Sequence, residues 1–320
     1  MTGFKKMMVI VVAAVMVFVC ITAGAGCSSG DGNEALPTED AGDGDGTYQP
    51  EISAPPIVYP YTFEDQTGYS VTLPHEPMTV VTVGPDITEI MFAIGRGIQI
   101  IGRSEEDSFP ADVEEIPSIG SINSPDAEAI AELEPDIILL TDRVPAEKIA
   151  EIREKNIPTV VINTPQTFEG IYDSIKYIGR VLNGEKAAYS YVVDMQGDIS
   201  TMLINNAGNE KHKVCIVTEY SEETDAVITS KANLSKYGYY EDVIKTVGGK
   251  SCDINEDPYY IVCIGEKLKT QVEKSTAMQD LAAVKMGRVY YVYEESFEIR
   301  SQRSVNALYA IAEVMGYTLL

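Results

Sequence analysis

Tryptophan is absent from the 320-residue sequence, and histidine and cysteine are rare, with two and five residues. Because only His75 and His212 are available, a metal centre built from several histidines is excluded. None of the cysteines forms a C-x-x-C pair, so a zinc ribbon and a thioredoxin-type motif are excluded as well. Two histidines also leave few ways to build a Ser-His-Asp or Cys-His arrangement. We therefore expect no catalytic residues and no metal site.

Basic residues are scarce too: 24 lysines and arginines stand against 49 aspartates and glutamates, for a formal charge of −25. A chain with this balance cannot present the large basic face that nucleic acids require, so we expect no nucleic-acid partner. Hydrophobic residues make up 45% and charged residues 23%, as is usual for a globular chain. The length favours more than one lobe or domain.

The N-terminal region carries the one long apolar run, which follows two lysines and extends over residues 7–26 without a charge. Such a run is either a signal peptide or a membrane-spanning helix. It ends in three small residues before Cys27, which resembles a bacterial lipoprotein signal. We predict a signal peptide over residues 1–26 and lipidation of Cys27. An uncleaved helical anchor is the alternative, and both place the chain on the outer face of the cytoplasmic membrane.

The next segment, residues 27–57, contains seven acidic residues, no basic residue and many Gly, Ser and Pro. This composition cannot bury a core and repels itself, because its charges all have one sign. We predict a flexible acidic tether between the lipid anchor and the folded part of the chain.

From residue 58 onward, short β-branched runs alternate with amphipathic helical segments. The runs that read as strands are residues 79–83, 98–101, 137–140, 159–162, 213–217, 260–264 and 289–292. Alternation of this kind is typical of parallel or mixed sheets covered by helices on both faces. The sequence therefore predicts an α/β fold.

Only in the middle of the chain do two helical segments follow each other without a strand, at residues 168–182 and at 185 to about 205. We predict two α/β lobes, residues 58–182 and 209–320, joined by a single long bridging helix within residues 183–208. Ligands bind such sheets at the carboxyl ends of strands and between domains, so we expect the ligand cleft between the lobes.

Four stretches in this order resemble the ABC-transporter substrate-binding proteins for iron complexes and cobalamin: residues 80–90, 119–138, 246–249 and 281–290. The resemblance implies two lobes on one rigid helix and a binding protein that delivers a metal chelate to an ABC permease and its ATPase. It implies no enzymatic activity and no intrinsic cofactor. One departure is a short segment between Gly249 and Pro258, where the family usually has a helix.

The resemblance also implies a docking surface, on which an acidic residue of each lobe pairs with an arginine of the permease. Glu89 is the match in the first lobe, and Glu241 or Asp242 is the match in the second. The second implied surface is the cleft, where arginines would hold a bulky anionic ligand through charge-assisted hydrogen bonds. The candidate ligand-binding residues are Gly84, Pro85, Asp86, Arg103, Arg143, Tyr220, Tyr293, Arg300 and Arg303.

A ferric siderophore is the ligand that we expect, with cobalamin and haem as alternatives. Ser121 stands where some haem carriers of this family have a tyrosine, and the missing tryptophan counts against cobalamin. Two other classes of protein stay open: a sensor without transport on the same fold, and a surface enzyme with a nitrogenase-like redox fold. The spacing of Cys215, Cys252 and Cys263 does not suggest a metal cluster, and their odd number leaves at least one thiol free.

The predicted lipid anchor can be tested at Cys27. The substitution Cys27→Ser removes the thiol that would carry the lipid, so we expect it to abolish the incorporation of labelled palmitate and the processing of the signal peptide. As a control, Cys20→Ser, inside the apolar run, leaves both unchanged. Normal labelling of the Cys27→Ser protein would contradict the prediction.

Overall fold

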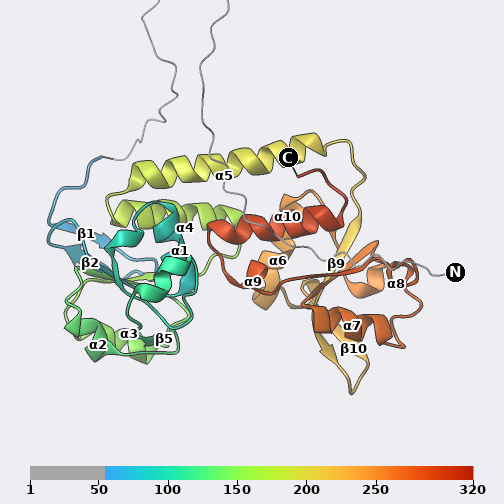
Figure 1. Cartoon of the computed structure of the whole chain (residues 1–320), viewed down its shortest axis with the longest axis horizontal. Helices are drawn as coiled ribbons and strands as arrows, with labels where there is room; N and C mark the ends of the chain where they lie inside the picture. The colour runs from blue at the N-terminus through green and yellow to red at the C-terminus, as the bar shows by residue number, and fades with distance from the viewer. Residues whose placement is uncertain (1–54, 320) are drawn as a thin grey trace, which may run out of the picture. The chain divides into compact units, whose positions relative to one another are not determined.

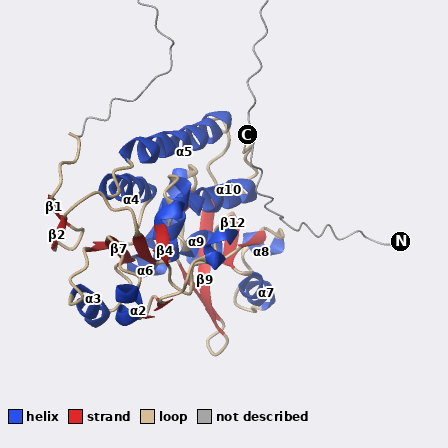
Figure 2. Ribbon diagram, turned by 60° about the vertical axis from the view of Figure 1, so that its left-hand side comes forward, coloured by secondary structure: helices blue, strands red, loops and turns tan. Residues whose placement is uncertain are grey.

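The computed structural model describes residues 55–319, so the predicted signal peptide, Cys27 and most of the predicted tether lie outside the described residues. Within this range, two β-sheets are covered by helices on both faces, as Figures 1 and 2 show. The predicted α/β fold is confirmed. No helix within the described range is long and apolar enough to cross a membrane.

The first sheet has the strand order β4-β3-β7-β8 and is parallel throughout. Its strands are β3 (Val80–Val83), β4 (Ile100–Gly102), β7 (Ile137–Thr141) and β8 (Thr159–Ile162). Its helices are α1 (Pro85–Ala93), α2 (Ala127–Glu132), α3 (Ala146–Arg153) and α4 (Phe168–Val181). Successive side chains of a strand point to opposite faces. Val80 therefore packs in the cluster of α1 and α4, whereas its neighbour Val81 packs in that of α2 and α3.

Two short antiparallel ribbons flank this sheet. The pair β1 (Tyr61–Glu64) and β2 (Ser70–Leu73) forms a hairpin, and β5 (Gly120–Ser121) pairs with β6 (Ser124–Pro125). The hairpin is held by the buried carboxylate of Asp65, which accepts a hydrogen bond from the Val161 amide at 3.0 Å and pairs with Arg153 at 2.8 Å. This first-lobe ion pair ties the hairpin to β8 and α3.

The second sheet has the order β10-β9-β12-β13, with β11 beside β9. Its strands are β9 (Lys213–Ser221), β10 (Ala226–Thr229), β11 (Lys250–Ser251), β12 (Tyr260–Ile264) and β13 (Val289–Val292). All neighbours are parallel except β10, which forms a hairpin with β9. The helices are α6 (Leu234–Thr246), α7 (Glu266–Lys274), α8 (Ala282–Lys285), α9 (Glu295–Glu298) and α10 (Val305–Val314).

Between β11 and β12 the chain makes only a short 3-10 helix, η4 (Ile254–Glu256), which Asp253 opens with a capping box. This agrees with the short segment between Gly249 and Pro258 that the sequence indicates. Cys215, Cys252 and Cys263 are all buried free thiols in the core cluster on the α7 side of the sheet. They pack as small apolar residues, and no disulfide forms among the residues that the structure describes.

Helix α5 (Glu185–Asn205) follows α4 directly and runs along it, and Figure 1 shows it passing from the first sheet toward the second. Its buried residues, Ala188, Val192, Met195, Ile199 and Met202, belong to one apolar cluster. That cluster also contains residues of α1, α4, α6 and α10, so a single core extends across both halves of the described chain. The predicted limits of the bridging segment, residues 183 and 208, fall in the turns on either side of α5.

Candidate functional site

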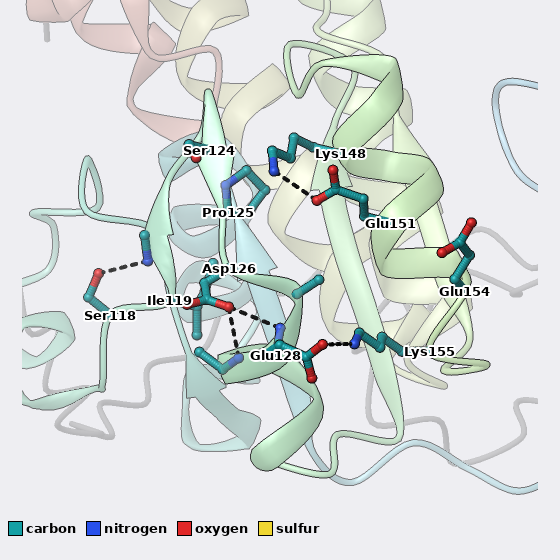
Figure 3. A pocket seen from close by; sticks show the side chains of 13 residues that line it. Ser118, Ile119, Ser124, Pro125, Asp126, Glu128, Lys148, Glu151, Glu154 and Lys155 are labelled. Carbon is teal, nitrogen blue, oxygen red and sulfur yellow. Dashed lines mark hydrogen bonds and ion pairs between the residues drawn. The ribbon is translucent and has the colours of Figure 1, made fainter.

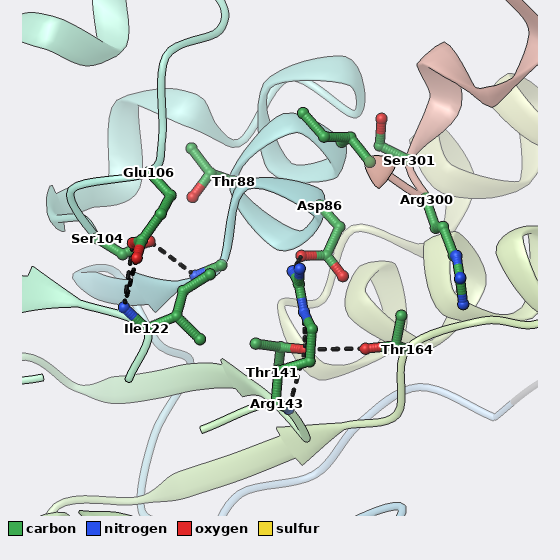
Figure 4. Close-up of polar contacts among 12 residues, drawn as sticks. Asp86, Thr88, Ser104, Glu106, Ile122, Thr141, Arg143, Thr164, Arg300 and Ser301 are labelled. Carbon is green, nitrogen blue, oxygen red and sulfur yellow. Dashed lines mark hydrogen bonds and ion pairs between the residues drawn. The ribbon is translucent and has the colours of Figure 1, made fainter. Parts of the chain in front are cut away.

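The carboxyl ends of β3 and β7 carry the first group of predicted ligand-binding residues. Gly84, Pro85 and Asp86 follow β3, and Arg143 follows β7. The Arg143 Nη2 atom lies 2.8 Å from Asp86 Oδ1, in an ion pair whose arginine is 40% exposed and whose aspartate is 7% exposed (Figure 4). The structure thus brings these two predicted residues together at the edge where parallel sheets usually bind ligands.

Glycine is required at position 84 because of this close approach. Its φ of 127° lies in a region that other residues rarely adopt, and a Cβ atom there would stand 3.0 Å from both Asp86 Oδ1 and a methyl carbon of Thr141. Pro85 then starts α1, where its missing amide hydrogen costs nothing. Both residues position Asp86 at the first turn of the helix.

The second half of the chain contributes Arg300, which is half-buried and donates a hydrogen bond from Nη1 to the Pro165 carbonyl oxygen at 2.8 Å. Its guanidinium lies over the ring of Tyr239 at 5.1 Å, and Figure 4 shows it beside Asp86 and Arg143. Its Nε atom is buried and has no hydrogen-bond partner among the described residues. This donor of Arg300 is therefore unsatisfied in the present conformation.

We call Asp86, Arg143, Glu298 and Arg300 the interlobe cluster, since two members come from each half of the chain. Burial raises the pKa of Asp86 although Arg143 opposes the shift, and burial together with Glu294 raises the pKa of Glu298. Burial lowers the pKa of Arg300, and the neighbouring Arg143 acts in the same direction. The four residues comprise two carboxyl groups and two guanidinium groups, so their formal charges sum to zero.

Asp107 forms a second polar centre beneath α1, and the sequence reasoning missed it. Its side chain accepts hydrogen bonds from Thr88 Oγ1 at 2.6 Å and from Ser104 Oγ at 2.7 Å, and only 2% of the residue is exposed. Burial raises the pKa of Asp107 to about 6, while the two hydroxyl hydrogen bonds oppose the shift. It lies in an acidic stretch that includes Glu105 and Glu106, so no local signal marked it as buried.

Two predicted ligand-binding arginines have other partners in the structure. Arg103 donates from Nε to the carbonyl oxygens of Val113 and Ile116, at 2.9 and 3.2 Å, and so holds its own loop. Arg303 pairs with Glu89 and lies over the ring of Phe109 at 4.3 Å. These contacts leave fewer arginine donors for an anionic ligand than we expected.

The two predicted tyrosines lie in the second half of the chain. The Tyr220 hydroxyl donates to Asp225 at 2.7 Å within the β9–β10 hairpin. Tyr293 is 51% exposed, and its ring meets that of Tyr291 edge-on at 5.8 Å. In residues 55–319, no hydrogen bond or ring contact joins either tyrosine to the interlobe cluster.

The three acidic residues predicted to dock on a permease are engaged within the chain. Glu89 is 1% exposed and pairs with Arg303, and Glu241 is 5% exposed and accepts hydrogen bonds from Ser230 and Ser251. Asp242 Oδ2 accepts a hydrogen bond from the Phe168 amide at 2.8 Å. Docking on another protein requires exposed groups. In this conformation the carboxylates of Glu89 and Glu241 are buried.

A surface hollow of about 760 Å³ lies between α2, α3 and the β5–β6 ribbon (Figure 3). Lys148 pairs with Glu151 within α3 at 2.7 Å, and Lys155 pairs with Glu128 of α2. Its lining residues also include Asp126, which caps α2, and Glu154. Four carboxylates against two lysines make this hollow acidic. No group of His, Cys, Asp and Glu suited to a metal ion occurs in the described part of the chain.

Comparison with known proteins identifies relatives that match most of this chain. The family model described as periplasmic binding protein matches residues 80–271. An uncharacterized ABC transporter substrate-binding lipoprotein, YvrC of Bacillus subtilis, is 25% identical over 275 residues, which is 80% of this chain and 85% of YvrC. A vitamin B12-binding protein of Vibrio parahaemolyticus is 22% identical over 261 residues, 76% of this chain and 92% of that protein.

Among solved structures, a possible iron-binding (periplasmic solute-binding) protein of Staphylococcus epidermidis superposes with a TM-score of 0.66. It is 18% identical, and the match covers 75% of this chain and 99% of that one. At this identity the likeness concerns the fold alone.

The buried carboxyl of Asp107 predicts a pH-dependent stability. Because its pKa is about 6 when folded and 3.8 when unfolded, the folded protein holds an extra proton between these values, and stability falls as pH rises through this window. The free energy of unfolding relative to Asp107→Asn should therefore fall by about 2 kcal/mol from pH 4 to pH 7, measured by urea denaturation. The exposed Asp112→Asn is the control, and a pH-independent difference for Asp107→Asn would refute the assignment.

Proposed function

Since the chain belongs to the periplasmic binding protein family, we propose that it captures a corrinoid such as cobalamin between its two lobes and delivers it to an ABC permease and its ATPase. We infer that the chain is the substrate-binding protein of an ABC importer, as its relatives' names suggest. Capture and delivery need no bond chemistry, so we expect no catalytic activity. The observation that carries the choice of ligand is the zero formal charge of the interlobe cluster.

The charge of the cluster argues against the ferric siderophore that we first expected. A multiply anionic ligand needs an excess of positive charge at its site, because the desolvated charges must be compensated. Arg103 and Arg303 are bound within the chain, and Arg143 is already paired with Asp86. Arg300 forms no ion pair among the described residues, and Glu298 lies close enough to Arg143 for their charges to interact. A ferric siderophore of low charge remains the alternative.

A corrinoid suits this environment better, since its rim carries neutral amide groups rather than carboxylates. Amides need donors and acceptors in equal measure, and the cluster provides guanidinium donors beside carboxylate acceptors. Thr141 and Thr164, whose hydroxyls lie 3.1 Å apart, add two more groups at the same edge (Figure 4). A vitamin B12-binding protein among the relatives gives independent support.

For docking we propose a different surface from Glu89. An acid that pairs with a permease arginine must be exposed, and the Glu128 side chain at the rim of the α2–α3 hollow is 79% exposed. Its present partner, Lys155, can exchange for an arginine of another protein at small cost, because exposed ion pairs are worth about 0.2–1 kcal/mol. The hollow thus offers the permease an acidic, concave contact on the first lobe. The predicted lipid anchor would hold the protein beside its permease.

The ligand assignment is tested with coloured compounds. We expect the purified protein to retain cyanocobalamin after desalting, seen in the visible spectrum, and to release ferric hydroxamate, ferric catecholate and haemin. Arg300→Ala should weaken cobalamin binding roughly tenfold, because one charged hydrogen-bond donor is lost. Arg288→Ala, whose guanidinium stacks on Tyr259 away from the cluster, is the matched control. Retention of a ferric siderophore instead of cobalamin would overturn the assignment.

The docking surface is tested by charge reversal in cells. Glu128→Lys should strongly reduce the uptake of labelled cobalamin while the affinity of the isolated protein is unchanged, because the side chain lies outside the interlobe cluster. Glu210→Lys reverses an acid that is 83% exposed on the second lobe and serves as control. Normal uptake by the Glu128→Lys strain would show that the hollow is not the docking site.

A further inference from the structure

The two lobes are joined by a set of side-chain bonds besides α5. We propose that the buried pair of Glu89 and Arg303 acts as an interlobe clamp, which sets the angle between the lobes and thereby the shape of the ligand cleft. Glu89 lies in α1 beside the first sheet, and Arg303 lies in the 3-10 helix η5 (Gln302–Ser304), before α10 of the second lobe. The two residues are 214 positions apart in the sequence.

The geometry of the pair is that of a fork. Arg303 donates from Nε to Glu89 Oε2 at 2.8 Å and from Nη2 to Oε1, and the Ser301 hydroxyl donates to Oε2 at 2.5 Å. Both carboxylate oxygens are therefore used, in the bidentate arrangement that makes arginine–carboxylate pairs directional. A directional bond of this kind restrains orientation as well as distance.

The burial of Glu89 is what makes the pair a restraint on the lobes. Only 1% of its side chain is exposed, against 28% for Arg303. Within residues 55–319, every hydrogen bond to its carboxylate comes from Ser301 or Arg303, both in the second lobe. If the lobes turned apart, a buried charge would lose all of its partners, which is strongly unfavourable. The first lobe cannot satisfy this residue alone.

Other interlobe contacts surround the clamp and support the same orientation. Asp242 of α6 accepts from the Phe168 amide at the start of α4, and Arg300 donates to the Pro165 carbonyl, both at 2.8 Å. The rings of Phe168 and Tyr239 stack at 5.8 Å between these bonds. These contacts join the two lobes at points other than Glu89 and Arg303, so they restrain the same orientation.

The clamp is also connected to the cleft. The guanidinium of Arg303 lies over Phe109, in the loop that carries Asp107, and Thr88, next to Glu89 in α1, donates to Asp107. A change in the Glu89–Arg303 bond would therefore move the loop beside Asp86 and the interlobe cluster. This second consequence, an effect on ligand release, rests on the proposed function, whereas the effect on the lobe angle does not.

The test measures the distance between spin labels on the two lobes. Labels are attached at cysteines that replace Glu151 of α3 and Lys285 of α8, whose side chains are 50% and 58% exposed. The full chain in detergent carries Cys20→Ser and Cys27→Ser, and the three native thiols in the described range are buried. We expect Glu89→Gln and Arg303→Lys to broaden the distance distribution and to speed cobalamin release roughly tenfold, since a less restrained lobe angle opens the cleft more often.

The matched control is Arg153→Lys, which weakens the buried pair with Asp65 inside the first lobe. It should lower the melting temperature as the clamp variants do, but leave the interlobe distance unchanged. Unchanged distances in Glu89→Gln and Arg303→Lys, with lowered melting temperatures, would reduce the pair to an ordinary stabilising contact and overturn the proposal. Broadened distances in a protein that binds none of the four coloured ligands would support the clamp and refute the proposed function separately.

Discussion

The buried carboxylate of Glu89 and the arginine that meets it from the other half of the chain organise the centre of this protein. Burial removes water from the charge, and the loss is offset only when Ser301 and Arg303 are in place. The surrounding apolar cluster, which runs from α1 through α5 to α10, lowers the local dielectric and makes the correct pairing more favourable and any other arrangement more costly. The formation of the two lobes and their mutual orientation are therefore coupled.

Buried carboxylates need positively charged partners, and this need explains how the chain uses its few arginines. With 24 basic against 49 acidic residues, the interior competes with the ligand site for guanidinium groups. Arg103 holds carbonyl oxygens of its own loop, Arg303 compensates Glu89, and Arg143 compensates Asp86. What remains at the carboxyl ends of the strands is a balanced set of donors and acceptors. A site of this kind recognises the hydrogen-bonding pattern of a ligand more than its charge, which is the basis of the corrinoid proposal.

Much of the architecture could be predicted because it depends on patterns of a few residues. The β-branched runs at residues 79–83 and 137–140 form buried strands, the uninterrupted helical stretch after residue 185 becomes α5, and the short segment before Pro258 lacks a helix. Helix α1 shows the limit of such patterns. Every residue from Pro85 to Met91 is buried, whereas an amphipathic helix buries one face, because α1 has the sheet on one side and the second lobe near its other. The burial of Glu89, which faces the second lobe, could not be predicted from the residues beside it in the sequence.

The sequence by itself determined the order of strands and helices, the break at Gly84 and the poverty in positive charge, since periodicity, chain stiffness and composition are local or additive properties. Only the tertiary structure decided which polar groups meet. Arg143 and Asp86 are 57 residues apart and Arg303 and Glu89 are 214 apart, so neither pairing is encoded in a local spacing. An acidic side chain on a helix looks the same in a sequence whether it faces water or a guanidinium. The difference arises when the two lobes pack against each other through α1, α4, α6 and η5, because water is then excluded and each buried charge must find a partner.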